Sequence, residues 1–139
     1  MTARYGEAAA NDSGLRYRIM IVQDDFLLRM ETAADLRQWG YDVVEAFSES
    51  DARRALRADR RIALVLLDVN VGGEQHGLEL ARWIRGHHPQ MKVLLTAAVA
   101  PTADGVPVLD KPYRPLALLQ HIDALLKVQG RSPSGGEQR

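Results

Sequence analysis

Apolar positions along the chain follow two spacings, one typical of buried strands and the other typical of helices. Residues 62–67 form an unbroken apolar run, the pattern of a strand buried on both faces of a parallel sheet. Residues 26–39 instead place Leu36 and Trp39 at helical spacing, and Gly40 follows as a C-terminal stop. The complete pattern predicts strands at residues 17–22, 41–46, 62–67, 91–95 and 106–109, and helices at 26–39, 48–56, 77–85 and 113–127.

The strands and helices alternate along the chain, which favours an open α/β sheet with parallel strands. Crossovers between parallel strands are right-handed, and five such strands commonly take the order 2-1-3-4-5. Ser48 and Asp51 resemble a capping box at the start of the second helix. We therefore expect a five-stranded parallel sheet in that order, with helices on both faces.

Composition places the chain among single globular domains, with 139 residues of which 46% are apolar and 26% charged. We expect the domain to span residues 16–128, between flexible polar segments at residues 1–15 and 129–139. No apolar run approaches the ~20 residues of a membrane span, and the start of the chain lacks the apolar region of a secretory signal. These features predict a soluble cytoplasmic protein.

Charge and cysteine content exclude several function classes. Eighteen basic residues balance 18 acidic residues, without the basic excess of a typical nucleic-acid binder. The absence of cysteine excludes disulfides, thiolate zinc sites and cysteine nucleophiles. The four histidines lack metal-ligand spacing and are interpreted as surface residues. A group of arginines near the second helix is interpreted as a solvated face, with partner docking as the alternative: Arg53, Arg54, Arg57, Arg60 and Arg61.

Five polar residues stand at the carboxyl ends of the predicted strands. Asp24 and Asp25 follow the first strand, and Asp68 ends the third. Thr96 ends the fourth strand, and Lys111 follows the fifth. Parallel strands bring these ends to one edge, where ligands of open α/β sheets bind. Carboxylate oxygens are suitable ligands for Mg²⁺, and a carboxylate can also act as a nucleophile that forms an aspartyl-phosphate. Phosphoryl transfer needs a cation and hydroxyl donors to neutralise charge on the phosphoryl oxygens.

Each of these residues also has a simpler interpretation. Asp24 and Asp25 precede a helix, so either could be a plain N-cap. Thr96 could be an ordinary β-branched strand residue, and Lys111 a solvated loop lysine. Asp68 is different, because a carboxylate at the end of an apolar strand gains nothing from packing. The joint occurrence at strand ends favours the functional interpretation.

The set of motifs resembles that of response-regulator receiver domains of two-component signalling, the CheY-like family. The matching segments are Gln-Asp-Asp at 23–25, Leu-Leu-Asp at 66–68, Leu-Leu-Thr-Ala at 94–97 and Asp-Lys-Pro-Tyr at 110–113. They occur in the family's order, and the resemblance covers about residues 17–127. Each motif alone is weak, whereas all of them together form a specific signal.

The resemblance implies a role for each residue of the phosphorylation site. Asp68 resembles the phosphoryl acceptor, Thr96 the hydroxyl that bonds a phosphoryl oxygen, and Lys111 the cation that pairs with another. The Lys111–Pro112 peptide bond is often cis in this family, and cis forms are otherwise uncommon.

The resemblance also implies a Mg²⁺ site beside the acceptor. Asp25 resembles the direct ligand, Asp24 the acid that holds the metal through water, and Asp68 a further ligand. Asn70 would contribute its backbone carbonyl.

The sequence departs from the family in three places. The segment between Thr96 and Lys111 is short and contains Pro101, which leaves room for one or two turns of the helix usually found there. Val108 stands where the family usually has Tyr or Phe, so we expect an altered output switch. Gln23 is a milder departure, at a position where the family tolerates variety.

The resemblance implies a stand-alone receiver that takes a phosphoryl group from a histidine kinase or histidine phosphotransfer protein. It would signal through contacts with an unknown downstream protein, without nucleic acid or membrane, as a monomer or weak dimer. It would not be an enzyme beyond its own phosphorylation and autodephosphorylation.

Two other functions remain open. One is an interaction module that has the receiver fold but does not use phosphorylation. The other is a Mg²⁺-dependent phosphohydrolase, which is weakened because Asn70 stands where a general acid would follow Asp68.

Overall fold

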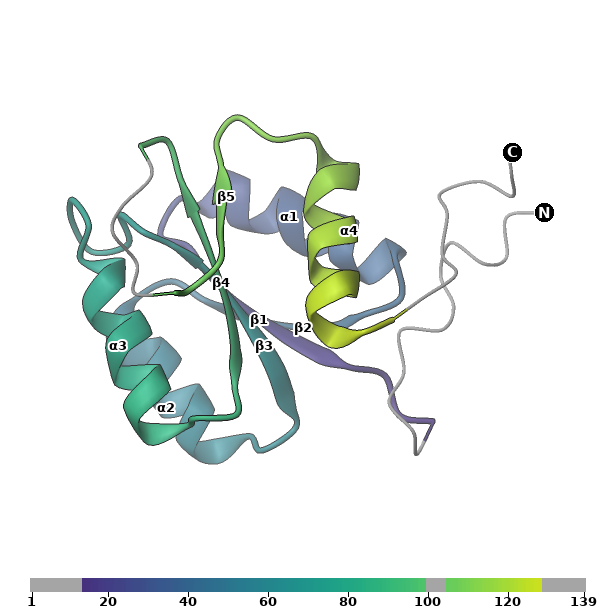
Figure 1. Cartoon of the computed structure of the whole chain (residues 1–139), viewed down its shortest axis with the longest axis horizontal. Coiled ribbons are helices and arrows are strands. Elements are labelled where there is room, and N and C mark those ends of the chain that lie inside the picture. Colours follow the sequence, from purple (N-terminus) through teal and green to yellow (C-terminus); the bar gives the residue numbers. More distant parts are fainter. Residues whose placement is uncertain (1–13, 100–104, 129–139) are drawn as a thin grey trace.

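Five parallel strands form the centre of the structure, a computed structural model that describes residues 14–99 and 105–128. Their order across the sheet is β2-β1-β3-β4-β5, which confirms the predicted order (Figure 1). The strands are β1 (Arg18–Val22), β2 (Asp42–Ala46), β3 (Ile62–Asp68), β4 (Lys92–Ala97) and β5 (Val108–Asp110).

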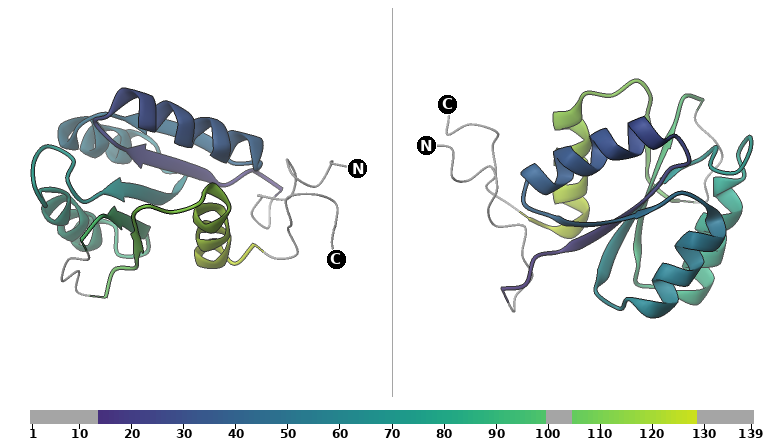
Figure 2. Two further views of the ribbon diagram at one scale, coloured as in Figure 1. Left: turned by 90° about the horizontal axis from the view of Figure 1, so that it is seen from above. Right: turned by 180° about the vertical axis from the view of Figure 1, so that it is seen from behind.

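Helices cover both faces of this sheet, as the sequence predicts. The described residues contain α1 (Phe26–Gln38), α2 (Glu49–Ala58), α3 (Gly77–His87) and α4 (Pro115–Leu126). Helices α1 and α4 lie on one face, and α2 and α3 lie on the other (Figure 2). None of the helices in this part of the chain has the length and apolar character needed to cross a membrane.

Alternate residues of the strands divide the core into two clusters, one on each face. Ile21 and Leu66 pack on the side of α1 and α4, whereas Val22 and Leu67 pack on the side of α2 and α3. Strand β3 is central and has neighbours on both sides, so its side chains are buried on both faces. This burial explains the unbroken apolar run in the sequence.

Local chemistry explains where several elements begin. The Ser48 hydroxyl accepts a hydrogen bond of 3.1 Å from the Asp51 N–H, which confirms the predicted cap of α2. Strand β5 begins at Val108, later than predicted, because Pro107 has no N–H for the ladder. Helix α4 begins at Pro115, which suits the first position of a helix.

A buried carboxylate ties α4 to α1. Asp123 of α4 is only 7% exposed. It accepts a hydrogen bond of 3.0 Å from the Trp39 ring N–H, and another from the Tyr41 hydroxyl. Both aromatic residues are fully buried beside it, so this polar group is satisfied inside the apolar cluster.

The connection from β4 to β5 is described only in part. Residues 98–99 and 105–107 contain no helix, and residues 100–104 lie outside the described residues. The expectation of a short or absent helix therefore stays a prediction for that segment. The expected flexible segments at residues 1–15 and 129–139 likewise lie almost wholly outside the described residues.

Candidate functional site

Asp68 is the last residue of β3 and is only 7% exposed. Its Oδ2 accepts two hydrogen bonds, 2.6 Å from the Lys111 Nζ and 2.7 Å from the Gln23 Nε2. Its Oδ1 accepts a third, 2.7 Å from the backbone N–H of Asn70. The carboxylate is therefore held by groups from three separate parts of the chain.

These donors keep the Asp68 carboxyl ionised. Burial by itself raises the pKa of this carboxyl. Hydrogen bonds from Lys111, Asn70 and Gln23, with the Lys111 charge, outweigh burial, so the pKa lies below its ordinary value of 3.8. At neutral pH Asp68 is thus a carboxylate, the form that can act as a nucleophile.

Lys111 reaches Asp68 from the end of β5. The Lys111 N–H donates to the Ala97 carbonyl at 2.8 Å, which fixes the start of the following turn against β4. The Lys111–Pro112 peptide bond is cis, as predicted. The Lys111 side chain is 26% exposed, so the pair with Asp68 stands at the border between the core and solvent.

Thr96 lies beside the acceptor on the neighbouring strand. Its Cα is paired with that of Asp68 in the parallel register of β3 and β4. Thr96 is buried, and its carbonyl accepts a hydrogen bond of 3.0 Å from the Val69 N–H. The predicted meeting of Asp68, Thr96 and Lys111 at one edge is therefore what the structure shows.

Gln23 is the site residue that sequence reasoning undervalued. The β1–β3 register pairs Val22 with Leu67, so the next residue of each strand, Gln23 and Asp68, also meet. Gln23 is 7% exposed, and its Oε1 accepts a hydrogen bond of 2.9 Å from the Asp25 N–H. The available signal was its position, one residue after a buried strand.

Asp24 and Asp25 face different partners, and both are exposed. The Asp24 Oδ2 accepts a hydrogen bond of 3.2 Å from the Gly72 N–H, in the loop that follows Asp68. The Asp25 Oδ1 accepts one of 3.0 Å from the Leu28 N–H and caps α1. The capping interpretation that the sequence left open thus applies to Asp25 in this structure.

The loop between β3 and α3 is held tightly against the acceptor. The Asn70 Oδ1 accepts a hydrogen bond of 2.9 Å from the Gln75 N–H. Gly77 donates its N–H to the Val69 carbonyl at 2.7 Å. A Cβ on Gly77 would stand 2.5 Å from the Asp68 carbonyl oxygen, so only glycine allows α3 to begin here.

The residues present are compatible with a magnesium ion held by few protein ligands. Across residues 14–99 and 105–128, no three or more His, Cys, Asp or Glu side chains are arranged to hold a metal. Asp24 and Asp68 both contact the β3–α3 loop, however, and Mg²⁺ needs only one or two carboxylates because it keeps several waters. The predicted set of Asp24, Asp25, Asp68 and Asn70 stays a prediction.

Tyr113 is a further residue that the structure places near the acceptor. It is half-buried, and burial is the main cause that raises the pKa of its hydroxyl above the ordinary 10.0. The negative charges of Asp68 and Asp35 raise it further, against a hydrogen bond with Thr32 that lowers it. The phenol is therefore neutral and lies within the electrostatic reach of the acceptor.

Known proteins are similar to this chain in sequence family and in fold. A family model described as "Response regulator receiver domain" matches residues 19–123. A response regulator receiver domain protein (CheY-like) from Methanospirillum hungatei is 26% identical, with a TM-score of 0.71, over 79% of this chain and 93% of that chain. A response regulator from Thermotoga maritima is 27% identical, with a TM-score of 0.68, over 79% and 97% of the two chains.

The receiver domain of NtrX from Brucella abortus is also similar to this chain. It is 26% identical, with a TM-score of 0.70, over 80% of this chain and 99% of that chain. No curated protein matches the chain by sequence.

Proposed function

The chain belongs to the response regulator receiver domain family, and on this premise we propose that Asp68 accepts a phosphoryl group from a phosphohistidine. Membership supports a phosphoacceptor role in two-component signalling. The observation that carries the proposal is the buried Asp68 carboxylate, held ionised by the Lys111 ammonium at 2.6 Å.

The proposed step forms one bond and breaks one. A carboxylate oxygen of Asp68 attacks the phosphorus, and the P–N bond to the donor imidazole breaks with its electron pair staying on nitrogen. An acyl phosphate results. Lys111 then pairs with a phosphoryl oxygen, and the Thr96 hydroxyl bonds another, which spreads the charge that phosphoryl transfer must stabilise.

We propose that Mg²⁺ binds at the same edge, through the carboxylates of Asp24 and Asp68 and the carbonyl of Asn70. When bound, the ion would neutralise charge on the phosphoryl oxygens. Asp25, the direct ligand that the resemblance implies, uses its Oδ1 to cap the Leu28 N–H, whereas Asp24 already contacts the β3–α3 loop that carries Asn70. We therefore favour Asp24 as the direct ligand.

The start of α1 supports docking of the phosphodonor at this edge. Phe26 is 64% exposed and Leu27 58%, and both directly follow the acidic pair. An apolar groove of about 530 Å³ lies beside them, between α1 and α4, and Lys111 and Tyr113 form part of its wall. Exposed apolar patches of this kind mark protein contacts, so we propose a histidine kinase or histidine phosphotransfer protein as the partner.

A second candidate function is the phosphorylation-independent interaction module. One observation favours it: Asp68 already accepts three hydrogen bonds from protein groups, one of them from the neutral amide of Gln23. Such a site is stable without phosphate. The two functions differ in whether the acceptor reacts.

Incubation with acetyl phosphate and Mg²⁺, followed by intact mass measurement, tests the proposal. We expect a mass increase of one phosphoryl group that maps to Asp68, that chelation of Mg²⁺ abolishes, and that Asp68→Asn removes. Asp110→Asn, an exposed acid beside Lys111, is the matched control and should react normally. An unmodified protein would support the interaction module, and release of many phosphates per chain would support a phosphohydrolase.

A further inference from the structure

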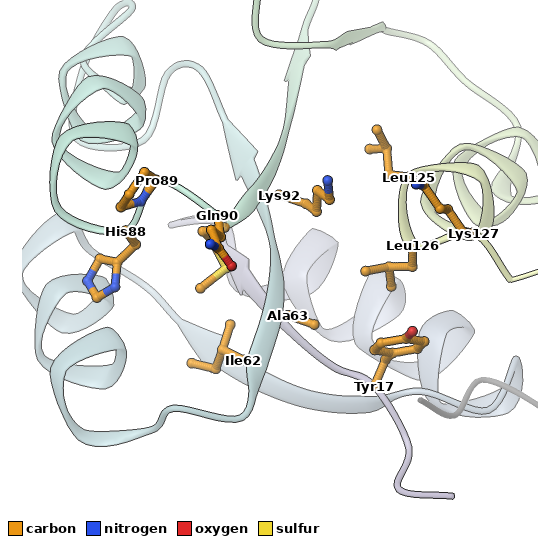
Figure 3. A pocket seen from close by; sticks show the side chains of 11 residues that line it. Tyr17, Ile62, Ala63, His88, Pro89, Gln90, Lys92, Leu125, Leu126 and Lys127 are labelled. Atoms are coloured by element: carbon orange, nitrogen blue, oxygen red, sulfur yellow. The ribbon is translucent and has the colours of Figure 1, made fainter. Parts of the chain in front are cut away.

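The amino ends of the strands, opposite the acceptor, border a hollow of about 720 Å³. It lies between the residues that follow α3 and the end of α4, with Lys92 at the start of β4 between them (Figure 3). Tyr17, Met91 and Leu125 are half-buried residues of its wall. Strand β3 runs from this edge to Asp68, so the two places are about 20 Å apart at ~3.3 Å per residue.

A second hollow, of about 540 Å³, adjoins the first. The two share Ile62, His88 and Met91, and the second extends to Arg57 and Arg60 at the end of α2. The two hollows therefore adjoin along the start of the sheet, from α2 to α4, and we treat them as one trough. We call this trough the amino-edge groove.

The amino-edge groove carries positive charge that the described part of the chain does not neutralise. Within residues 14–99 and 105–128, the side chains of Arg60, Lys92 and Lys127 make no hydrogen bond or ion pair. Asp59 is the one acidic residue among the described lining, and it is already paired with Arg18 at 2.6 Å. Several cations thus surround an apolar floor without acidic partners.

The shape and chemistry of the groove favour one kind of occupant. A trough that continues from α2 to α4 is too long for one small anion, whereas a peptide can follow it. Its floor of Tyr17, Met91 and Leu125 suits apolar side chains, and the cations around it suit acidic ones. The terminal segments 1–13 and 129–139 of the chain contain no run of acidic residues that could serve as this occupant.

We propose that the amino-edge groove docks a partner protein through a short acidic segment that also carries apolar side chains. This contact would be separate from the phosphodonor surface on α1, and it does not depend on phosphorylation of Asp68. The arginines near α2, interpreted from sequence as a solvated face, contribute Arg57 and Arg60 to it.

A labelled eight-residue peptide of Glu and Leu, titrated into the full chain and followed by fluorescence anisotropy, tests this proposal. We expect saturable binding that weakens as salt rises, because screening reduces the attraction between the charges. A peptide of Lys and Leu should not bind, and one of Glu and Ser should bind at least about tenfold more weakly, since it cannot use the apolar floor. Amide chemical shifts should change around Tyr17, Lys92 and Lys127.

The variant Arg60→Glu/Lys92→Glu should bind the Glu–Leu peptide at least about tenfold more weakly, because both contacts become repulsive. The control is Arg114→Glu, which reverses an exposed charge outside the groove and should bind normally. Both variants should melt and react with acetyl phosphate like the wild type, so a failure of the Asp68 proposal would leave this test intact.

Three outcomes would overturn the proposal. One is an equal loss of binding in the control variant, and another is a set of shifts confined to the Asp68 edge. The third is preferential binding of phosphatidylglycerol vesicles over the peptide, which would assign the groove to a lipid surface.

Discussion

Gln23→Glu should destabilise the metal-free protein and make its stability depend on Mg²⁺. The Gln23 amide donates to the Asp68 Oδ2 at 2.7 Å. A glutamate in its place cannot donate, and its carboxylate would face that of Asp68. The substitution therefore replaces a hydrogen bond by a repulsion with hardly any change in side-chain size.

The magnitude follows from the geometry. Two unit charges about 4 Å apart repel by about 4 kcal/mol at an effective dielectric constant of about 20. The Lys111 ammonium, 2.6 Å from the Asp68 Oδ2, attracts both carboxylates and offsets part of this energy. Adding about 1 kcal/mol for the lost hydrogen bond, we expect the free energy of unfolding to fall by about 2–3 kcal/mol at pH 7.

The pH dependence of this deficit has a defined sign. Like-charge repulsion raises the folded-state pKa of the carboxyl pair in the variant, so the deficit is complete above that raised pKa. It shrinks as pH falls toward about 4, where a proton removes one of the charges. Mg²⁺ should restore most of the deficit at pH 7, because it binds the folded protein and not the unfolded chain.

Urea unfolding in chelator and in Mg²⁺, followed by the fluorescence of the buried Trp39, measures these effects. Gln120→Glu makes the same chemical change on the exposed surface of α4, and it should be neutral in both conditions. Equal urea midpoints for wild type and Gln23→Glu in chelator would refute the reasoning, as would a deficit that Mg²⁺ leaves unchanged.

Three further predictions follow from the site and the core. Asp68→Asn should lose phosphorylation and about 1–2 kcal/mol of stability at pH 7, because it removes a charged hydrogen bond with Lys111. The folded-state pKa of Asp68 lies below its ordinary value of 3.8, so the stability difference between wild type and Asp68→Asn should disappear in acid titrations as pH falls through this lowered pKa. Asp24→Ala should weaken Mg²⁺ binding in calorimetry about tenfold or more. Asp25→Ala should mainly lower the free energy of unfolding by about 1 kcal/mol, through the lost helix cap. The reverse pattern would identify Asp25 as the direct ligand. Asp123→Ala should cost about 2–4 kcal/mol in urea, because two buried donors lose their acceptor, and Asp123→Asn should recover part of that loss.

The topology and three site residues were predictable from sequence because burial leaves a strong signal. The unbroken apolar run before Asp68 identified the central strand, and the strand ends placed Thr96 and Lys111 beside it. Most boundaries shifted by one or two residues, and the proline before Val108 explains the late start of β5.

The arrangement around the acceptor was less predictable, for a physical reason. An N-cap and a metal ligand use the same carboxylate oxygens, so Asp25 satisfies either interpretation until the extended backbone at its position is known. Gln23 carries no charge and stands at a position where the family tolerates variety, and only the β1–β3 register brings its amide to Asp68. The structure thus shows the Asp68 carboxylate surrounded by donors, and the sequence alone did not identify Gln23 among them.

The side chains that hold the Asp68 Oδ2 lie 45 positions before it and 43 positions after it in the chain. During synthesis, β1 and β3 can therefore pair and bury the acceptor before the ribosome has made Lys111. A chain that ends before β5 would contain Asp68 without the Lys111 ammonium, so the ionised form of Asp68 would be less stabilised. Such a fragment could bind a phosphodonor protein but would accept a phosphoryl group poorly. The complete set of donors around Asp68 is consequently present only once β5 has formed and has brought Lys111 to the site.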